Sequence, residues 1–319
     1  MSDSSSMKKV LITGGTGLIG RHLFTMLKDK GYDVTVMSRK KTYLLNMPTV
    51  FWDVSDRIID VEAINSANYI IHLAGNKVAR YKWTFTRKKK LYVSRVNSAQ
   101  LILDNIDREN TNLKAFISAS AIGCYGYAEP DKIFSEDDDF GTDFLANLCE
   151  DWEFVTSNFS IVGARTVSIR TALVLDKKTC LLSKFSFLMR LGLGSVVGSG
   201  KQFMPWIHIR DLCRIYIMAI ENPKMRGPYN AVAPEHVNNI EFTKSLAYCL
   251  NRSIRLPNTP DYLMRFVYGE RANMILNGNR ISSDKIRNTG FVFEHKTLDS
   301  ALSDLYKNKH SFIHYLLSK

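Results

Sequence analysis

Three glycines near the start of the chain have the spacing of a phosphate-binding turn. Gly14, Gly17 and Gly20 follow a short apolar run, residues 10–12, and lead into an amphipathic run that reaches Lys30. In a strand–turn–helix unit, the first glycine permits the tight turn, the second lets the backbone approach a pyrophosphate, and the third lets the helix lie close to the strand. The free N–H groups at the helix start attract phosphate. The residues that we predict to bind a dinucleotide here are Gly14, Thr16, Gly17, Leu18, Ile19 and Gly20.

The residues after the next predicted strand, residues 33–37, indicate which dinucleotide binds. They read Ser38-Arg39-Lys40, where a site for NAD would place an Asp or Glu to hold the ribose hydroxyls. A carboxylate would repel a 2′-phosphate, whereas a hydroxyl and two cations would bind it. We therefore predict NADP as the cofactor, held by Ser38, Arg39 and Lys40. The alternative is that Arg39 and Lys40 are ordinary surface cations.

The elements that must position these residues alternate along the first half of the chain. Apolar runs predict strands over residues 10–12, 33–37, 50–53, 69–75, 114–120 and 165–169, with amphipathic helical runs between several of them. Such alternation predicts an α/β fold, a Rossmann doubly wound parallel sheet. Beyond about residue 172 the pattern loosens, and prolines and glycines break the chain into short pieces. We therefore predict an NADP-binding domain over residues 7–172 and a smaller substrate-binding lobe over residues 173–319.

The ends of two further strands supply candidates for the same cofactor site. Asp53 stands at the exit of the third predicted strand, where this topology places the adenine pocket. The fourth predicted strand ends in Leu73-Ala74-Gly75, and small residues at the carboxyl end of a strand leave room for a ligand to pass. We therefore add Asp53, Leu73, Ala74 and Gly75 to the predicted cofactor-binding residues. His72 lies inside the fourth strand, so we interpret it as a packed core residue and not as a catalyst.

The composition excludes several other classes of protein. A chain of 319 residues with 45% hydrophobic content can bury a sizeable core, and it has no apolar run long enough to cross a bilayer. The first six residues lack an apolar signal core, and the five cysteines form no CxxC pair or His/Cys cluster. We therefore expect neither export, nor disulfides, nor a bound metal, and we expect a cytoplasmic protein.

The net charge of +12 is partly concentrated between Arg80 and Arg95. Nucleic-acid binding is one interpretation of this cluster. We favour a solvated face of a helix over residues 86–106, because no nucleic-acid motif accompanies the charge. An anionic cofactor and an anionic substrate would also benefit from it. We expect a small-molecule substrate and no nucleic-acid or membrane partner, and the sequence leaves open whether the protein is a homo-oligomer.

Together these features resemble the extended short-chain dehydrogenase/reductase superfamily, the group of nucleotide-sugar epimerases and dehydratases. The closer resemblance is to an atypical branch labelled epimerase-family or sugar-nucleotide-epimerase-like proteins, which carries a C-terminal domain of unknown function. The segments that carry it are His72-Leu73-Ala74-Gly75, Ser94-Arg95, Ser118-Ala119-Ser120-Ala121, Trp152-Glu153, Trp206-Ile207-His208, and the tail from Gly278-Asn279-Arg280 to Ala301-Leu302. The resemblance implies that a hydride moves between a nicotinamide and a carbon that bears oxygen.

The proton donor that the resemblance implies is missing. The superfamily uses a tyrosine with a lysine four residues later, together with a serine that orients the substrate oxygen. Of the fourteen tyrosines, only Tyr315 with Lys319 has this spacing, at the far end of the sequence. Aligned on Glu153, the tyrosine position falls on Leu145 and the lysine position on Cys149, whose thiol we expect to stay neutral.

Two catalytic candidates and two functions therefore stand side by side. Ser120 matches the serine of the superfamily, and Tyr125 could supply a phenol from another direction, so we predict both as catalytic residues. One hypothesis is an NADP-dependent oxidoreductase or epimerase with a rearranged proton donor. The polar residues Lys201, Gln202, Trp206 and His208 of the second lobe favour it. The other hypothesis is a sensor or interaction protein that binds NADP(H) without turnover. The missing pair favours it, as does the cell-division-inhibitor label that some relatives carry.

Overall fold

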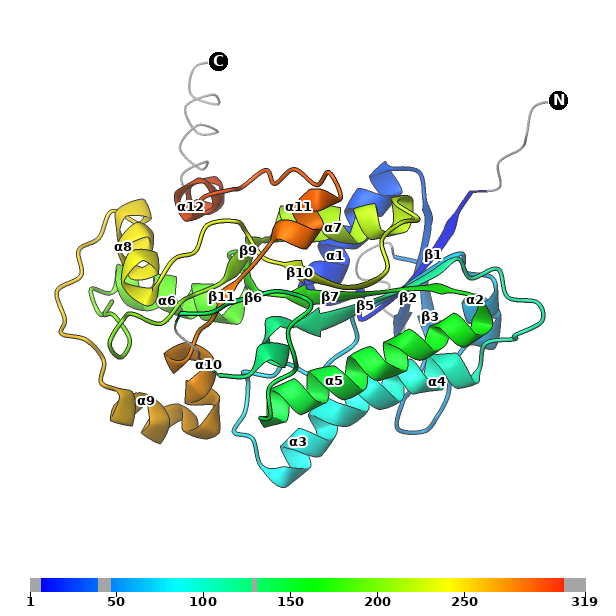
Figure 1. Cartoon of the computed structure of the whole chain (residues 1–319), viewed down its shortest axis with the longest axis horizontal. Coiled ribbons are helices and arrows are strands. Elements are labelled where there is room, and N and C mark those ends of the chain that lie inside the picture. Colours follow the sequence, from blue (N-terminus) through cyan, green and yellow to red (C-terminus); the bar gives the residue numbers. More distant parts are fainter. Residues whose placement is uncertain (1–6, 40–46, 128–130, 307–319) are drawn as a thin grey trace, which may run out of the picture. The chain divides into compact units, whose positions relative to one another are not determined.

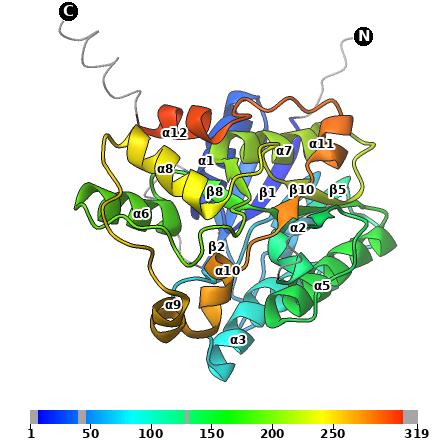
Figure 2. The same ribbon diagram turned by 60° about the vertical axis from the view of Figure 1, so that its left-hand side comes forward.

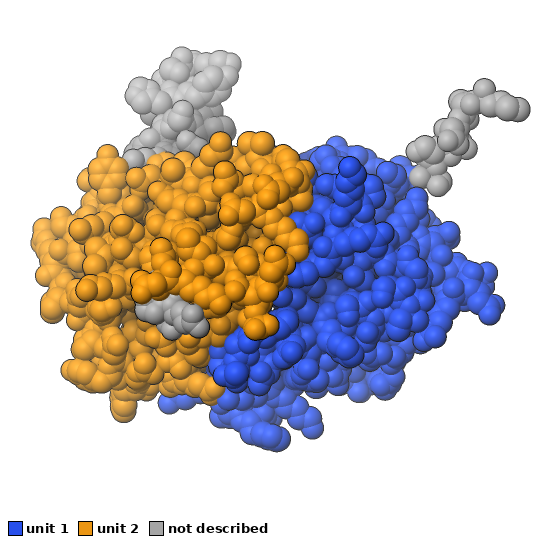
Figure 3. All heavy atoms as spheres, in the orientation of Figure 1, with its two compact units in different colours: residues 1–124, 140–170, 213–229 blue, residues 125–139, 171–212, 230–319 orange. Residues whose placement is uncertain are grey.

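The computed structural model describes residues 7–39, 47–127 and 131–306, which gather into two compact units (Figure 3). The first unit comprises residues 1–124, 140–170 and 213–229, and the second comprises residues 125–139, 171–212 and 230–319. The chain thus passes between the units several times, including once inside an α-helix, residues 209–221, and twice inside a strand, residues 165–171 and 227–231. The functional domain ranges 7–172 and 173–319 stay a prediction.

The first unit is built on a sheet of seven strands (Figure 1). They are β1 (Lys9–Thr13), β2 (Asp33–Ser38), β3 (Thr49–Phe51), β4 (Tyr69–His72), β5 (Ala115–Ala121), β7 (Arg165–Thr171) and β10 (Gly227–Ala231). The strands lie in the order β3-β2-β1-β4-β5-β7-β10, and the pairs β1–β2, β1–β4, β2–β3 and β4–β5 are parallel. The strand order reverses between β1 and β4, which is the point where doubly wound sheets bind ligands. The predicted Rossmann sheet is confirmed.

Helices cover both faces of this sheet (Figures 1 and 2). They are α1 (Leu18–Asp29), α2 (Val61–Asn65), α3 (Phe85–Tyr92), α4 (Ser98–Asp104), α5 (Phe144–Ser157) and the greater part of α7 (Ile209–Glu221). Helices α1 and α7 lie on one face, where Cys213 Sγ is 4.0 Å from the Ile19 carbonyl oxygen. Helices α3, α4 and α5 lie on the other face, and their core joins Ile70 and Phe116 of the strands to Trp152 of α5.

Local sequence explains the limits of two helices. Asp143 caps α5, because its carboxylate accepts hydrogen bonds from the backbone N–H groups of Leu145 and Ala146. The helix expected over residues 86–106 is present as α3 and α4, joined by a π-helical turn, Val93–Asn97. Such wide turns are rare and are often found at functional sites.

The second unit consists of short strands and helices. Its strands are β6 (Ile133–Phe134), β8 (Leu173–Leu175), β9 (Trp206–His208) and β11 (Arg280–Ile281), paired as β6–β11 and β8–β9. Its helices are α6 (Cys180–Arg190), α8 (Asn239–Cys249), α9 (Asp261–Tyr268), α10 (Asn273–Leu276), α11 (Asp284–Asn288) and α12 (Leu298–Tyr306). Helices α8 and α12 pack on a core that includes Trp206, Phe242 and Leu302. Among the described residues, no helix has both the length and the apolar character that crossing a bilayer requires.

Candidate cofactor and substrate site

The glycine turn forms a cradle at the start of α1. Gly14 has a φ of 68°, and a Cβ on it would lie 2.7 Å from the Leu73 carbonyl oxygen. A Cβ on Gly20 would lie 2.4 Å from Gly15 Cα, so only glycine lets α1 begin this close to the turn. Gly17 is the N-cap of α1, and no side chain accepts from the first backbone N–H groups of the helix. These N–H groups can therefore serve a phosphate, and the cradle fits the diphosphate of a dinucleotide.

The end of β4 lies against the same turn. The Leu73 N–H donates to the Thr13 carbonyl oxygen at 3.1 Å, and the Ala74 N–H donates to Thr13 Oγ1 at 3.3 Å. The structure thus brings the predicted residues Leu73 and Ala74 beside Gly14, at the point where the strand order reverses. Gly75 follows, and a Cβ on it would lie 3.1 Å from the Arg95 guanidinium.

His72 is buried in the core, as expected. Its Nδ1 lies 2.8 Å from Thr13 Oγ1, and its Nε2 lies 3.1 Å from Ser98 Oγ. Burial lowers the pKa of His72 to about 4, so the imidazole is neutral at pH 7. A neutral ring held at both nitrogens fixes the end of β4 beside the cradle.

The structure describes some of the residues that we predict to bind the adenosine half of the cofactor. Ser38 ends β2, and the exposed Arg39 follows it, while Lys40 lies outside the described residues. Asp53 lies just beyond β3, where its Oδ1 accepts two backbone N–H groups of the next turn at 2.8 and 3.4 Å. The roles of Ser38, Arg39 and Asp53 toward a cofactor stay predictions.

A buried hydrogen-bonded group surrounds Ser120 at the end of β5. Ser120 Oγ donates to Glu153 Oε1 of α5 at 2.6 Å. Arg170, at the end of β7, donates to Oε1 through Nε and to Oε2 through Nη2, both at 3.0 Å. Ser120 is 4% exposed, and the side chains of Arg170 and Glu153 are 3% and 11% exposed. We call these three residues the Ser120 group. Its bonds fix the direction in which the serine hydroxyl points.

Leu145 and Cys149, the residues that we predict at the tyrosine and lysine positions of the superfamily, have buried side chains, and this alignment stays a prediction. Leu145 is a core residue of α5, and Cys149 lies one turn further on. Burial raises the pKa of the Cys149 thiol to about 12, and the nearby Glu153 carboxylate adds to the effect. The expected neutral thiol is confirmed. Tyr315 and Lys319 lie outside the described residues.

Tyr125, the second predicted catalytic residue, belongs to a buried polar cluster of the second unit. Its hydroxyl donates to Asn230 Oδ1 at 2.7 Å, and its ring centroid is 5.2 Å from that of Phe134. The Asn230 backbone N–H in turn donates to Glu136 Oε1 at 2.6 Å. The catalytic role of Tyr125 stays a prediction.

Four polar residues of the second lobe were expected to favour a substrate site. Lys201 is exposed, and Gln202 Nε2 donates to two backbone carbonyl groups at 2.9 and 3.2 Å. Trp206 and His208 are both buried in strand β9. Two of these four side chains are therefore part of the core.

His208 forms a cluster with His295 and Asp304 that has the composition of a metal site. His208 Nε2 lies 3.4 Å from Asp304 Oδ2, and the centroids of the two imidazole rings are 3.9 Å apart. Burial lowers the pKa of His208 to about 4, and His295 adds to the effect. The Arg210 backbone N–H donates to His208 Nδ1 at 3.3 Å, so the neutral ring carries its hydrogen on Nε2. That nitrogen then offers no lone pair to a metal, and we interpret the cluster as the packing of a buried histidine against two half-buried side chains.

The basic residues around α3 have different surroundings. Lys89 is exposed, as expected for a solvated helix face. Arg95 departs from that expectation, because its guanidinium donates to the carbonyl oxygens of Leu91 and Asn76 at 3.2 and 3.0 Å. It also lies 5.3 Å from the centroid of the Trp152 ring, and burial lowers the pKa of Arg95 to about 10. Arg95 therefore ties the π-helical turn to the loop after β4.

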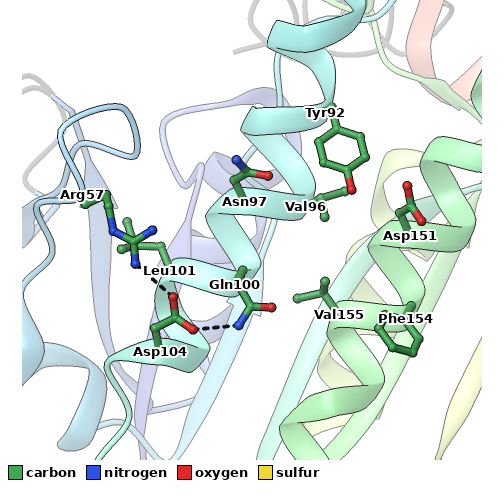
Figure 4. Close-up of a pocket in the computed structure, with 10 residues that line it drawn as sticks. All are labelled: Arg57, Tyr92, Val96, Asn97, Gln100, Leu101, Asp104, Asp151, Phe154 and Val155. Carbon is green, nitrogen blue, oxygen red and sulfur yellow. Dashed lines mark hydrogen bonds and ion pairs between the residues drawn. The ribbon is translucent and has the colours of Figure 1, made fainter.

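A hollow of about 470 Å³ lies between α4 and α5 (Figure 4). Gln100 and Asp104 line it from α4, and Asp151 and Phe154 line it from α5. Asp104 Oδ2 also accepts a hydrogen bond from Arg57 at 3.1 Å. None of the lining residues belongs to the cradle or to the Ser120 group, so we give this hollow no part in the site.

The parallel sheet and the glycine cradle define a dinucleotide-binding protein of the Rossmann class. A model described as the NAD dependent epimerase/dehydratase family matches residues 10–146, and a model of a domain of unknown function, DUF1731, matches residues 259–305. An epimerase family protein of Mycobacterium leprae is 32% identical over 304 residues, which cover 95% of this chain and 97% of that protein. The chain belongs to the NAD-dependent epimerase/dehydratase family.

Two solved structures support this assignment. The human epimerase family protein SDR39U1, solved with NADPH, is 29% identical with a TM-score of 0.83, and the match covers 94% of this chain and 99% of that one. A nucleoside-diphosphate sugar epimerase of Corynebacterium glutamicum is 30% identical with a TM-score of 0.77, covering 94% of this chain and 58% of that one. The resemblance inferred from the sequence is confirmed, and the family supports binding of NAD(P).

Sequence reasoning did not identify Glu153 and Arg170 as members of the site. Arg170 lies one residue beyond the strand expected at residues 165–169, and Glu153 served only as a point of alignment. A signal was present, because Glu153 lies four residues after Cys149 and therefore on the same face of a helix rich in apolar residues. A carboxylate on such a face requires a buried partner.

Proposed function

We propose that this protein binds NADP(H) in the glycine cradle and transfers a hydride to or from an oxygen-bearing carbon of a small-molecule substrate, as an oxidoreductase or an epimerase. The observation that carries the proposal is the uncapped start of α1 at the reversal of strand order, in the same unit as the buried Ser120 group. The bound nicotinamide would supply the hydride acceptor or donor, and Ser120 would orient the substrate oxygen. The basic residues near α3 favour an anionic substrate. The free thiols of the described residues favour a cytoplasmic location.

The preference for NADP rests on the residues after β2. Ser38 and Arg39 offer a hydroxyl and a cation, and the human relative was solved with NADPH. A hydrogen bond between charged groups contributes about 1.5–3 kcal/mol, so Arg39→Ala should weaken NADPH binding roughly 10- to 100-fold and leave NADH binding unchanged. Fluorescence titration with each cofactor measures this, and Lys28→Ala, an exposed lysine of α1, is the matched control. Equal or tighter binding of NADH by the unchanged protein would contradict the preference.

A second function, a sensor that binds NADP(H) without turnover, is favoured by the residues at the tyrosine and lysine positions. Leu145 has no proton to give, and the Cys149 thiol stays neutral because burial raises its pKa to about 12. Incubation of the protein and NADPH with a panel of carbonyl compounds and nucleotide sugars separates the two functions. Oxidation of NADPH that Ser120→Ala abolishes supports the enzyme. Tight binding of NADPH without any oxidation supports the sensor.

A further inference from the structure

The hydroxyl hydrogen of Ser120 is committed to a carboxylate. Ser120 Oγ donates to Glu153 Oε1 at 2.6 Å, which is the short distance of a hydrogen bond to an ionised acceptor. Arg170 holds both oxygens of that carboxylate from the opposite side, so Glu153 keeps its position and its charge is balanced. A serine hydroxyl has one hydrogen and two lone pairs. Ser120 can therefore act toward a substrate only as a hydrogen-bond acceptor.

Because the Ser120 hydroxyl donates to Glu153, this site differs from one in which the serine donates to a substrate carbonyl. Ser120 Oγ also interacts with the Cys149 thiol. The group that suits its remaining lone pair is a hydroxyl that donates a hydrogen. We propose that Ser120 and Glu153 form a proton relay in place of the missing tyrosine–lysine pair, and that the substrate bound in the oxidative direction is a secondary alcohol. The inference rests on the proposed function, since hydride transfer is what makes the alcohol proton acidic.

The step balances in atoms and electrons. The C–H bond of the alcohol breaks, and its electron pair leaves with the hydride to NADP⁺, the oxidant that the proposed function supplies. The O–H bond breaks at the same time, and its proton joins Ser120 Oγ. The original hydrogen of Ser120 passes to Glu153 Oε1, so the serine is restored, the alcohol becomes a carbonyl, and the carboxylate holds the released proton. Carbonyl reduction follows the same path in reverse.

The protonation states of the neighbouring side chains favour Glu153 as the group that accepts the proton. Burial raises the pKa of the Cys149 thiol to about 12, and burial also raises the pKa of the Cys124 thiol. Neutral thiols hold their protons at pH 7, and the Arg170 guanidinium is already protonated. Within the Ser120 group and these two cysteines, the Glu153 carboxylate is the one side chain able to accept a proton.

The first test is turnover by the whole 319-residue chain. A panel of secondary alcohols is oxidised with NADP⁺ by the unchanged protein and by three variants, Ser120→Ala, Glu153→Gln and Glu153→Asp. General acid–base groups contribute about 10²- to 10⁴-fold, so the first two variants should lose that factor in kcat while the Kd for NADPH stays within about twofold. Glu153→Asp keeps a carboxylate and should recover part of the rate. Glu150→Gln, an exposed residue of the same helix, is the control.

A double variant distinguishes loss of the proton relay from a folding defect. Glu153→Gln leaves Arg170 buried without its partner charge, whereas Glu153→Gln with Arg170→Gln removes both charges. We expect the double variant to fold, to bind NADPH and to stay as slow as Glu153→Gln. Oxidation by either of these variants at the rate of the unchanged protein would overturn the relay.

The second test needs no turnover. The short Ser120–Glu153 hydrogen bond should give an exchange-protected, downfield hydroxyl resonance in the proton NMR spectrum. It should persist with NADPH bound and in Glu150→Gln, and it should be lost in Ser120→Ala and shifted upfield in Glu153→Gln. Absence of this resonance from the unchanged protein would overturn the relay. Binding of NADPH with the resonance present but no alcohol oxidised would instead contradict the proposed function.

Discussion

Arg170 holds Glu153 at both carboxylate oxygens, through Nε and Nη2 at 3.0 Å each. The Arg170 side chain is buried and the Glu153 side chain is 11% exposed, and the guanidinium also lies 5.0 Å from the centroid of the Phe140 ring. Removing two charges from water costs about as much as their attraction returns, so a buried pair adds little net stability over an apolar pair. The main effect of this pair is therefore to fix the acceptor toward which the Ser120 hydroxyl points.

Breaking this pair should cost far more stability than replacing it. Arg170→Met leaves the Glu153 charge buried and unpaired, which should lower the free energy of unfolding by about 3–5 kcal/mol. The double variant Arg170→Met with Glu153→Leu removes both charges and should lose less than Arg170→Met alone. Urea denaturation measures each value. A double variant as unstable as the sum of its two single variants would contradict this account.

The cradle should be sensitive to a single methyl group. Gly20→Ala places a Cβ 2.4 Å from Gly15 Cα, which forces the start of α1 away from the turn and misaligns its N–H groups. We expect NADPH binding to weaken by roughly tenfold or more, a loss of about 1.4 kcal/mol. The control is Gly31→Asn, since Gly31 has a φ of 82°, which asparagine tolerates, and a Cβ there meets no atom within 4 Å. Isothermal titration calorimetry with NADPH should show the loss in Gly20→Ala alone.

Stability should fall in mild acid because of His72. Burial lowers its pKa from 6.5 to about 4, so between these values the unfolded chain binds a proton that the folded chain does not. The contribution of His72 to the free energy of unfolding is complete above pH 6.5. About 3 kcal/mol of that free energy is lost as the pH falls toward 4. Urea unfolding across this range measures the slope. His72→Gln does not titrate and should give a shallower slope, and identical slopes would rule the histidine out as the cause.

Arg95 should control the order of the loop after β4. Its guanidinium donates to the Asn76 and Leu91 carbonyl oxygens, and the Asn76 N–H donates to Ser94 Oγ at 3.0 Å. Arg95→Met should therefore reduce hydrogen-exchange protection in residues 74–78 while the centre of the sheet stays protected. Arg95→Lys should behave similarly, because an ammonium group lacks the rigid fork that reaches two carbonyls. Lys89→Met, on the exposed face of α3, should leave exchange unchanged.

The strands show how far sequence patterns reach in this chain. Runs of apolar residues predict the starts of β1, β2, β4, β5 and β7 within one residue, because strands buried on both faces require continuous apolar sequence. Strands β6 and β11 consist of two residues each and have no pattern of their own. They form because Arg280 and Ile281 pair with residues far earlier in the chain, which a local pattern cannot indicate.

The glycine cradle and the Ser120 group also differ in how well the sequence predicts them. The glycine cradle is local, since strand, turn and helix follow one another, and its predicted geometry is present. The Ser120 group joins residues 33 and 17 positions apart, so it depends on how α5 packs on the sheet. The π-helical turn is also hidden from the sequence, because residues 93–97 contain no glycine or proline that would mark an interruption of the helix. Its consequence, the inward Arg95, is therefore hidden as well.

The π-helical turn also determines which changes in chain length this protein tolerates. Arg95 inside the turn bonds to the Asn76 carbonyl, while Ser98 at the start of α4 lies 3.1 Å from His72 Nε2. Deletion of one residue between them would restore regular winding and leave Arg95 and Ser98 two positions apart, about 200° around the helix axis, where side chains do not face the same way. One of the two anchors would then point away from its partner. Relatives that keep both anchors should accordingly vary in residue identity across this segment while conserving its length.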